Sequence, residues 1–131
     1  MTNTYPPIET LVPHRSPLLQ IEAVHAWDGE RVEVDMSVRP DSLFVADGAM
    51  PAWVGIELMA QVIASHAGLQ AWQAGRPVKK GFLLGTRDFK SAVNHLPVGL
   101  ALRLSARPLY QEDSGLGSFE CHILAAESGA L

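Results

Sequence analysis

One imidazole, two carboxylates and one amide are candidates for proton-transfer chemistry: His14, Asp47, Glu57 and Gln61. Glu57 and Gln61 are four residues apart, so on an α-helix they lie about 40° from each other and face the same side. A carboxylate and an imidazole together are suited to general acid–base catalysis. His66 lies nine residues beyond Glu57, half a turn out of phase, so we interpret it as a packing or surface residue.

Other kinds of site are not indicated. The one cysteine, Cys121, can form neither an internal disulfide nor a thiolate metal site, and we expect no metal. The sequence has no glycine-rich phosphate loop and no serine nucleophile motif. The formal net charge is -4 and the basic residues are scattered, so nucleic acid is not an expected partner.

The composition fits a small folded protein. With 131 residues, 47% of them hydrophobic and 18% charged, the chain is expected to form a single domain spanning residues 1–131. The first fifteen residues contain no apolar run typical of a signal peptide, and polar side chains interrupt the apolar window at residues 43–69, which argues against a membrane span. A cytoplasmic location is expected.

The side chains must be positioned by a long helix and several strands. Apolar and polar residues alternate over residues 30–39, which predicts a strand, and Asp28-Gly29 predicts a hairpin to the apolar run at residues 18–26. A buried helix is predicted from Pro51 to about Gln73.

Small residues and helix-ending residues refine this prediction. Ala60, Ala64 and Gly68 give the helix a face that another backbone can approach closely, and Gly75 and Pro77 end it. Three further strands are predicted at residues 81–91, 99–110 and 118–126. Two strands, a helix and three strands favour an α+β hotdog fold, in which a curved antiparallel sheet wraps the helix. An unpaired sheet edge and an uncovered helix flank favour a dimer.

Four segments resemble a known family, in the same order. Residues 11–19 read Leu-Val-Pro-His-Arg-Ser-Pro-Leu-Leu, and residues 48–61 read Gly-Ala-Met-Pro-Ala-Trp-Val-Gly-Ile-Glu-Leu-Met-Ala-Gln. Residues 82–90 and 97–102 contain Phe-Leu-Leu-Gly with Phe-Lys, and Pro-Val-Gly-x-x-Leu. Together they resemble the FabZ and FabA type 3-hydroxyacyl-(acyl carrier protein) dehydratases, and most of all the small ApeP-type dehydratases of aryl polyene clusters.

The resemblance implies a function and a site. The expected reaction is dehydration of a 3-hydroxyacyl thioester, in fatty-acid or polyene biosynthesis, with the substrate held on the phosphopantetheine of an acyl carrier protein and no other cofactor. Glu57 matches the acidic catalytic position. The substrate-binding residues would be Gly48 and Gln61, together with Pro51, Ala52 and Trp53 at the start of the helix, where backbone N–H groups could bind the thioester oxygen. Gln61 could orient Glu57 or a water, or its amide could be satisfied against the neighbouring strand.

The sequence departs from the family at the catalytic histidine. Counted back from Glu57 without gaps, that position is Leu43, and no histidine occurs between His25 and His66. His14 or Asp47 could replace it. A structural role is the alternative for each, His14 holding the N-terminal turn and Asp47 capping a turn or the helix.

Other functions on the same fold remain open. The chain could be a non-catalytic hotdog subunit that partners an active dehydratase, or a thioesterase in which Glu57 activates water. The oligomer could accordingly be a homodimer or a hetero-oligomer with a second hotdog dehydratase. Compared with the resembled family, a final strand after Glu127 is expected to be short or missing.

Overall fold

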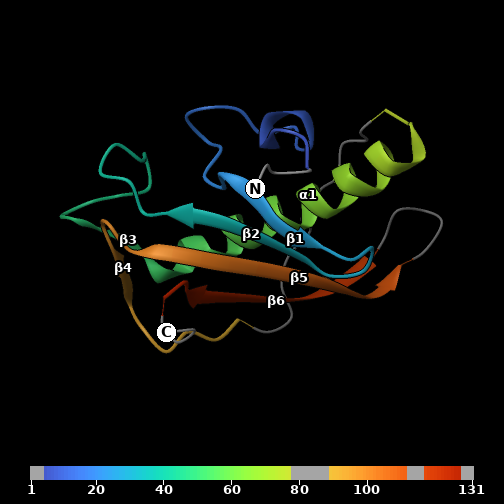
Figure 1. The fold of residues 1–131 in the computed structure, drawn as a ribbon. Helices are drawn as coiled ribbons and strands as arrows, with labels where there is room; N and C mark the ends of the chain where they lie inside the picture. Colours follow the sequence, from blue (N-terminus) through green and yellow to red (C-terminus); the bar gives the residue numbers. More distant parts are fainter. Residues whose placement is uncertain (1–4, 78–88, 112–116, 128–131) are drawn as a thin grey trace.

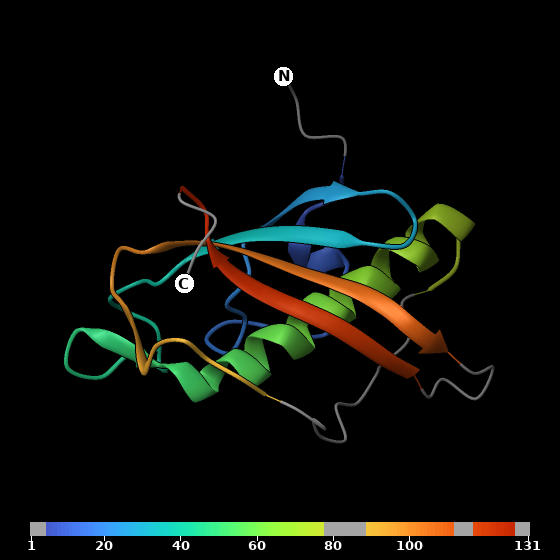
Figure 2. The same ribbon diagram turned by 90° about the horizontal axis from the view of Figure 1, so that it is seen from below.

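The computed structural model describes residues 5–77, 89–111 and 117–127. Within these residues, one long helix crosses one face of a four-stranded antiparallel sheet, and Figures 1 and 2 show this arrangement from two directions. The helix is α1 (Gly55–Ala74). The strands lie in the order β1-β2-β5-β6, with the bounds β1 (Ala23–Trp27), β2 (Val32–Ser37), β5 (Ala101–Gln111) and β6 (Gly117–Ala125). The predicted α+β architecture is confirmed.

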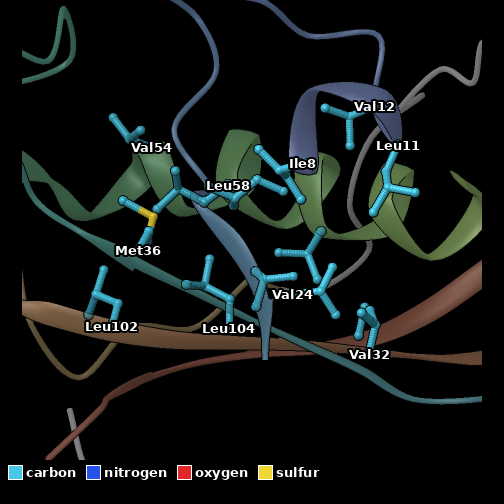
Figure 3. Close-up of a cluster of buried hydrophobic side chains, with 14 of the residues drawn as sticks. Ile8, Leu11, Val12, Val24, Val32, Met36, Val54, Leu58, Leu102 and Leu104 are labelled. Atoms are coloured by element: carbon cyan, nitrogen blue, oxygen red, sulfur yellow. The ribbon is translucent and has the colours of Figure 1, made fainter. Parts of the chain in front are cut away.

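The alternation in the central strands builds the core. In β2, Val32, Val34 and Met36 are buried, and opposite them on β5 lie Leu102 and Leu104, also fully buried. Residues between them point to the other face of the sheet, as the period of a strand requires. Figure 3 shows Met36, Leu102 and Leu104 on the side of the sheet that faces Val54 and Leu58, near the start of the helix.

Helix α1 begins and ends where the sequence predicts. A single 3₁₀ turn, η2 (Ala52–Val54), follows Pro51 and leads into the α-helix. At the other end Gly75 adopts a left-handed φ of 67°. The N–H groups of Gly75 and Arg76 donate to the carbonyls of Trp72 and Ala71, which is the Schellman pattern of a helix end. In the described residues, no helix is long and apolar enough to cross a lipid bilayer.

The N-terminal segment packs closely on α1. It contains the 3₁₀ turn η1 (Ile8–Thr10), and Leu11 and Val12 are buried next to it (Figure 3). Gly68 makes this approach possible, because a Cβ at this position would overlap the backbone carbonyl of Leu11. The predicted small-residue face is therefore used at Gly68, by the backbone of residues that precede His14.

Two predicted strands differ from the structure. Of the apolar run at residues 18–26, only residues 23–26 lie in a strand, because the N–H groups of Gln20 and Ile21 donate to the side chain of Gln61 instead of to a neighbouring strand. Of the strand predicted at residues 81–91, residues 81–88 lie outside the described residues, and residues 89–91 are not extended into a strand.

The sequence pattern did not predict a second, smaller sheet. It pairs β3 (Ala49–Pro51) with β4 (His95–Pro97), and it lies at the N-terminal end of α1 (Figure 1). Each strand has only three residues, and three residues are too few to show an alternation of apolar and polar side chains. The remaining predicted strands are confirmed as β2, β5 and β6.

Candidate active site

The structure brings His14 and Glu57 together. The Nε2 atom of His14 lies 3.6 Å from Oε2 of Glu57, and the two side chains are 23% and 40% exposed. This distance is too long for a strong hydrogen bond but short enough for an ion pair when the imidazole is protonated. Two groups that can hold a proton therefore face each other at a site open to solvent.

Gln61 fixes the position of the Glu57 carboxylate. Its side chain is completely buried and its Nε2 donates to Oε2 of Glu57 at 2.9 Å and to the carbonyl of Leu18 at 2.9 Å. Its Oε1 accepts the N–H groups of Gln20 at 2.8 Å and Ile21 at 3.3 Å. Because backbone N–H groups only donate, the amide cannot be turned over, and Nε2 must face the carboxylate.

The turn that carries His14 is held by its neighbour. The guanidinium of Arg15 donates from Nη1 to the carbonyls of Val12 and His14, both at 2.7 Å. The carbonyl of Arg15 in turn accepts the N–H groups of Leu18 and Leu19. Together with the Leu11 contact on Gly68, these bonds place the imidazole over the first turns of α1.

One oxygen of Glu57 has no partner. In the described part of the chain, no hydrogen bond or ion pair involves Oε1 of Glu57, whereas Oε2 faces Gln61 and His14. A neutral Glu57 can carry its proton on Oε1 while Oε2 continues to accept the hydrogen bond from Gln61. The partner-free oxygen is thus the one that can give a proton to, or take one from, a bound molecule.

Asp47 and Gly48 form a turn apart from this pair. Both have positive φ, 54° and 78°, and Ala46 and Ala49 on either side exchange two backbone hydrogen bonds. This is the geometry of a two-residue hairpin turn, for which Asp-Gly is a favoured sequence. Within the described residues, no hydrogen bond or ion pair links Asp47 to Glu57 or His14, so a turn-forming role accounts for Asp47 and Gly48 as they stand.

The start of the helix offers less than the sequence suggests. The N–H of Ala52 donates to the carbonyl of Asn94 at 2.9 Å, so it is not free for a substrate oxygen, and Pro51 has no N–H to offer. Trp53 is 65% exposed. It lies one turn before Glu57, on the same side of the helix.

Three large apolar side chains are exposed on the segments that carry or bond to Gln20, Gln61 and Glu57, and we call them the apolar rim: Leu18, Leu43 and Trp53. Leu18 is 53% exposed and Leu43 is 49% exposed. The carbonyl of Leu18 bonds to Gln61, and Leu43 follows Ser42, which bonds to the adjacent Gln20. Exposed large apolar side chains around a polar site are typical of a surface that binds a ligand or a partner.

A hollow lies on another side of the helix start. Its volume is about 180 Å³, and it lies between the beginning of α1, residues 89–93 and β6. Cys121 lines it, and burial raises the pKa of this thiol to about 11, so the cysteine is not an activated nucleophile. In the ranges that the structure describes, no group of three or more His, Cys, Asp or Glu side chains is arranged to hold a metal ion.

His66 is a packing residue, which decides between the packing and surface roles that the sequence left open. It is 1% exposed, and its ring contacts those of Trp27 and Phe119 edge to face. Nε1 of Trp27 donates to Nδ1 of His66 at 3.3 Å. Burial lowers the pKa of the imidazole below its ordinary value, and the nearby Asp28 only partly opposes this effect.

Sequence reasoning missed two residues that support the site. Gln20 and Ser42 are buried, 2% and 8% exposed, and the hydroxyl of Ser42 donates to Oε1 of Gln20 at 2.7 Å. An amide within the otherwise apolar run Leu-Leu-Gln-Ile is the signal that could have revealed Gln20, because buried amides need hydrogen-bond partners.

Comparison with known proteins shows a family match and a similar solved structure. Residues 6–131 match the model of the ApeP-like family, described as ApeP dehydratase. The chain is also similar to a chain of the dehydratase heterocomplex ApeI:P from Xenorhabdus doucetiae, with 30% sequence identity and a TM-score of 0.88, over 94% of this chain and 84% of that chain. No curated protein sequence matches.

Proposed function

Because the chain belongs to the ApeP-like family of hotdog dehydratases, we propose that it dehydrates a 3-hydroxyacyl group carried on an acyl carrier protein, with Glu57 and His14 as the catalytic pair. The observation that carries the proposal is the 3.6 Å approach of His14 Nε2 to a carboxylate that keeps one oxygen without a partner.

The reaction needs a base and an acid. The base removes a proton from the carbon next to the thioester carbonyl, the electron pair of that C–H bond forms the new double bond, and the C–O bond to the 3-hydroxyl breaks. His14 takes the first proton on Nε2. Glu57 gives the proton on Oε1 to the departing hydroxyl, which leaves as water. No electrons are gained or lost overall.

Because His14 and Glu57 lie close together, they can return to their starting protonation states after the reaction. After the reaction His14 carries a proton and Glu57 is a carboxylate, and Nε2 and Oε2 are 3.6 Å apart. One bridging water that bonds to Nε2 of His14 and to Oε1 of Glu57 lets the proton return to the oxygen that gave it. Gln61 keeps Oε2 on the side of His14 throughout, because it donates only to that oxygen of the carboxylate.

A second candidate is a subunit of a two-protein dehydratase, in which the partner supplies the usual histidine. The family histidine position, Leu43, is 49% exposed and belongs to the apolar rim of Leu18, Leu43 and Trp53. A partner chain that covered this rim would also cover the approach to Glu57. The similarity to a chain of a dehydratase heterocomplex favours this candidate as well.

One assay separates the two. Purified protein is incubated with a 3-hydroxyacyl carrier protein, alone and mixed with a second hotdog protein from the same operon, and loss of water is followed by mass spectrometry. Turnover by the protein alone supports the His14–Glu57 pair. Turnover only in the mixture supports the two-protein dehydratase, and no turnover in either arm contradicts a role in dehydration.

A further inference from the structure

Ser42 and Gln20 form a buried polar connection between the loop before β3 and the segment that follows His14. The hydroxyl of Ser42 donates to Oε1 of Gln20 at 2.7 Å and accepts the N–H of Phe44 at 3.3 Å. Nε2 of Gln20 donates to the carbonyls of Pro17 at 3.1 Å and Leu18 at 3.3 Å. The Gln20 side chain thus bonds at both ends.

Gln20 and Gln61 are connected in two ways, by a direct hydrogen bond and by a carbonyl that both side chains share. The backbone N–H of Gln20 donates to Oε1 of Gln61, and the carbonyl of Leu18 accepts hydrogens from both side-chain amides. Each amide has its oxygen opposite a donor and its nitrogen opposite an acceptor, so neither can be reversed. Ser42 is therefore bonded to the side chain of Gln20, and the backbone N–H of Gln20 is bonded to the side chain of Gln61. The side chain of Gln61 is in turn bonded to Oε2 of Glu57.

This arrangement costs more than a simple packing role requires. An aliphatic side chain at position 20 and an alanine at position 42 would remove the bond between the two side chains, and such paired replacements can be nearly neutral for stability. A fully satisfied polar network instead fixes one geometry of its members. Here the member at the open end of the network is the Glu57 carboxylate.

We propose that Ser42 and Gln20 are positioning residues, which hold Gln61 and, through it, keep the Glu57 carboxylate aimed for proton transfer. The inference rests on the proposed function of Glu57 and His14 in dehydration. Neither residue touches the reacting atoms in this scheme. Loss of either should therefore slow the chemical step and leave substrate binding nearly unchanged, because misplacement of a catalytic group raises the barrier without removing contacts to the substrate.

The test compares three serine variants in the assay arm that turns over with wild-type protein. Ser42→Ala removes the hydroxyl, Ser42→Thr keeps it, and Ser65→Ala removes another fully buried hydroxyl, which donates to the Val62 carbonyl on the same helix as Glu57. Ser42→Ala should lower kcat by about 10-fold or more with KM within about twofold. Ser42→Thr should recover most of the rate, and Ser65→Ala should keep the wild-type kcat.

A second measurement does not depend on turnover. Nitrogen-15 NMR reports how fast the side-chain amide hydrogens of Gln61 exchange with water, and this exchange should be faster in Ser42→Ala than in wild type and Ser65→Ala. Gln20→Leu repeats both measurements at the next residue of the network, in case Ser42→Ala does not fold.

The outcomes separate this inference from the proposed function. An active wild type together with an unchanged kcat in Ser42→Ala and Gln20→Leu overturns the positioning role and leaves the proposed function standing. An equal loss in Ser65→Ala, or a change confined to KM, also overturns it. A wild type without turnover in either arm overturns the proposed function, and the positioning role falls with it.

Discussion

His14 faces the start of α1 and His66 is part of α1, but the two rings differ in their exposure and in the groups that they contact. His14 is partly exposed and faces the carboxylate of Glu57, whereas His66 is buried and contacts the rings of Trp27 and Phe119. Each has a buried ring nitrogen without a partner in the described residues, Nδ1 in His14 and Nε2 in His66. The same side chain is thus suited to proton exchange in one setting and kept neutral in the other.

The carboxylate is what distinguishes the two settings, so its removal should have the largest effect. Glu57→Gln keeps the shape of the side chain and an oxygen that can accept from Gln61, but it cannot carry the proton. We expect kcat to fall by about 10²- to 10⁴-fold, the usual contribution of a general acid or base. Steady-state kinetics measures the loss, and circular dichroism checks the fold.

The matched control is Glu33→Gln, which removes a partly exposed carboxylate on β2, paired with Arg31 at 3.2 Å outside the site. It should keep the wild-type rate. A Glu57→Gln protein as active as Glu33→Gln would remove Glu57 from the chemistry.

The imidazole of His14 should have the next largest effect. His14→Gln keeps a polar side chain but supplies no base, and we expect kcat to fall by about 100-fold, at the lower end of the range for acid–base catalysis. The control is His25→Gln, because His25 also lies beside a carboxylate, with Nδ1 3.4 Å from Oδ2 of Asp35. Equal rates for the two variants would show that His14 is structural, and would favour a base from Asp47 or from a partner.

The setting of His14 also depends on how closely its segment lies against the helix. Gly68→Ala puts a Cβ against the backbone of Leu11, which cannot move aside as a side chain can, and we expect a loss of about 1–3 kcal/mol in the free energy of unfolding. Gly55→Ala on the same helix meets only the side chains of Ile123 and Phe89, at 3.2 and 3.3 Å, and should lose less. Urea unfolding measures both, and equal losses would contradict the role given to the Leu11 contact.

The two settings were not equally predictable from the sequence. Helical phase alone places His66 opposite Glu57, and it places Gln61 beside Glu57, since both statements depend only on 3.6 residues per turn. The long helix, its end at Gly75 and the central strands follow from patterns of the same local kind.

The approach of His14 to Glu57 has a different origin, because the two residues are 43 positions apart in the sequence. It depends on the close packing of the Leu11 backbone against Gly68 and on the hydrogen bond from Arg15 to the Val12 carbonyl. It also depends on the hydrogen bond from the backbone N–H of Gln20 to Gln61. The alternation of apolar and polar residues along the sequence does not predict such long-range contacts. For the same reason the turn at Asp47 was predictable as a turn, but its lack of a bond to His14 and Glu57 was not.

The smallest effect should come from the buried histidine, and it should appear in stability. The pKa of His66 is lowered in the folded protein from its ordinary 6.5, so at pH values below 6.5 the unfolded chain takes up a proton that the folded protein does not. The stabilisation is complete above pH 6.5 and is lost as the pH falls toward the folded pKa, by at most about 1.4 kcal/mol per pH unit. His66→Gln can still accept the Trp27 N–H but does not titrate. Urea unfolding of both proteins between about pH 8 and about pH 5 should therefore show a steeper decline for wild type, and parallel declines would mean that His66 takes up its proton without leaving the core.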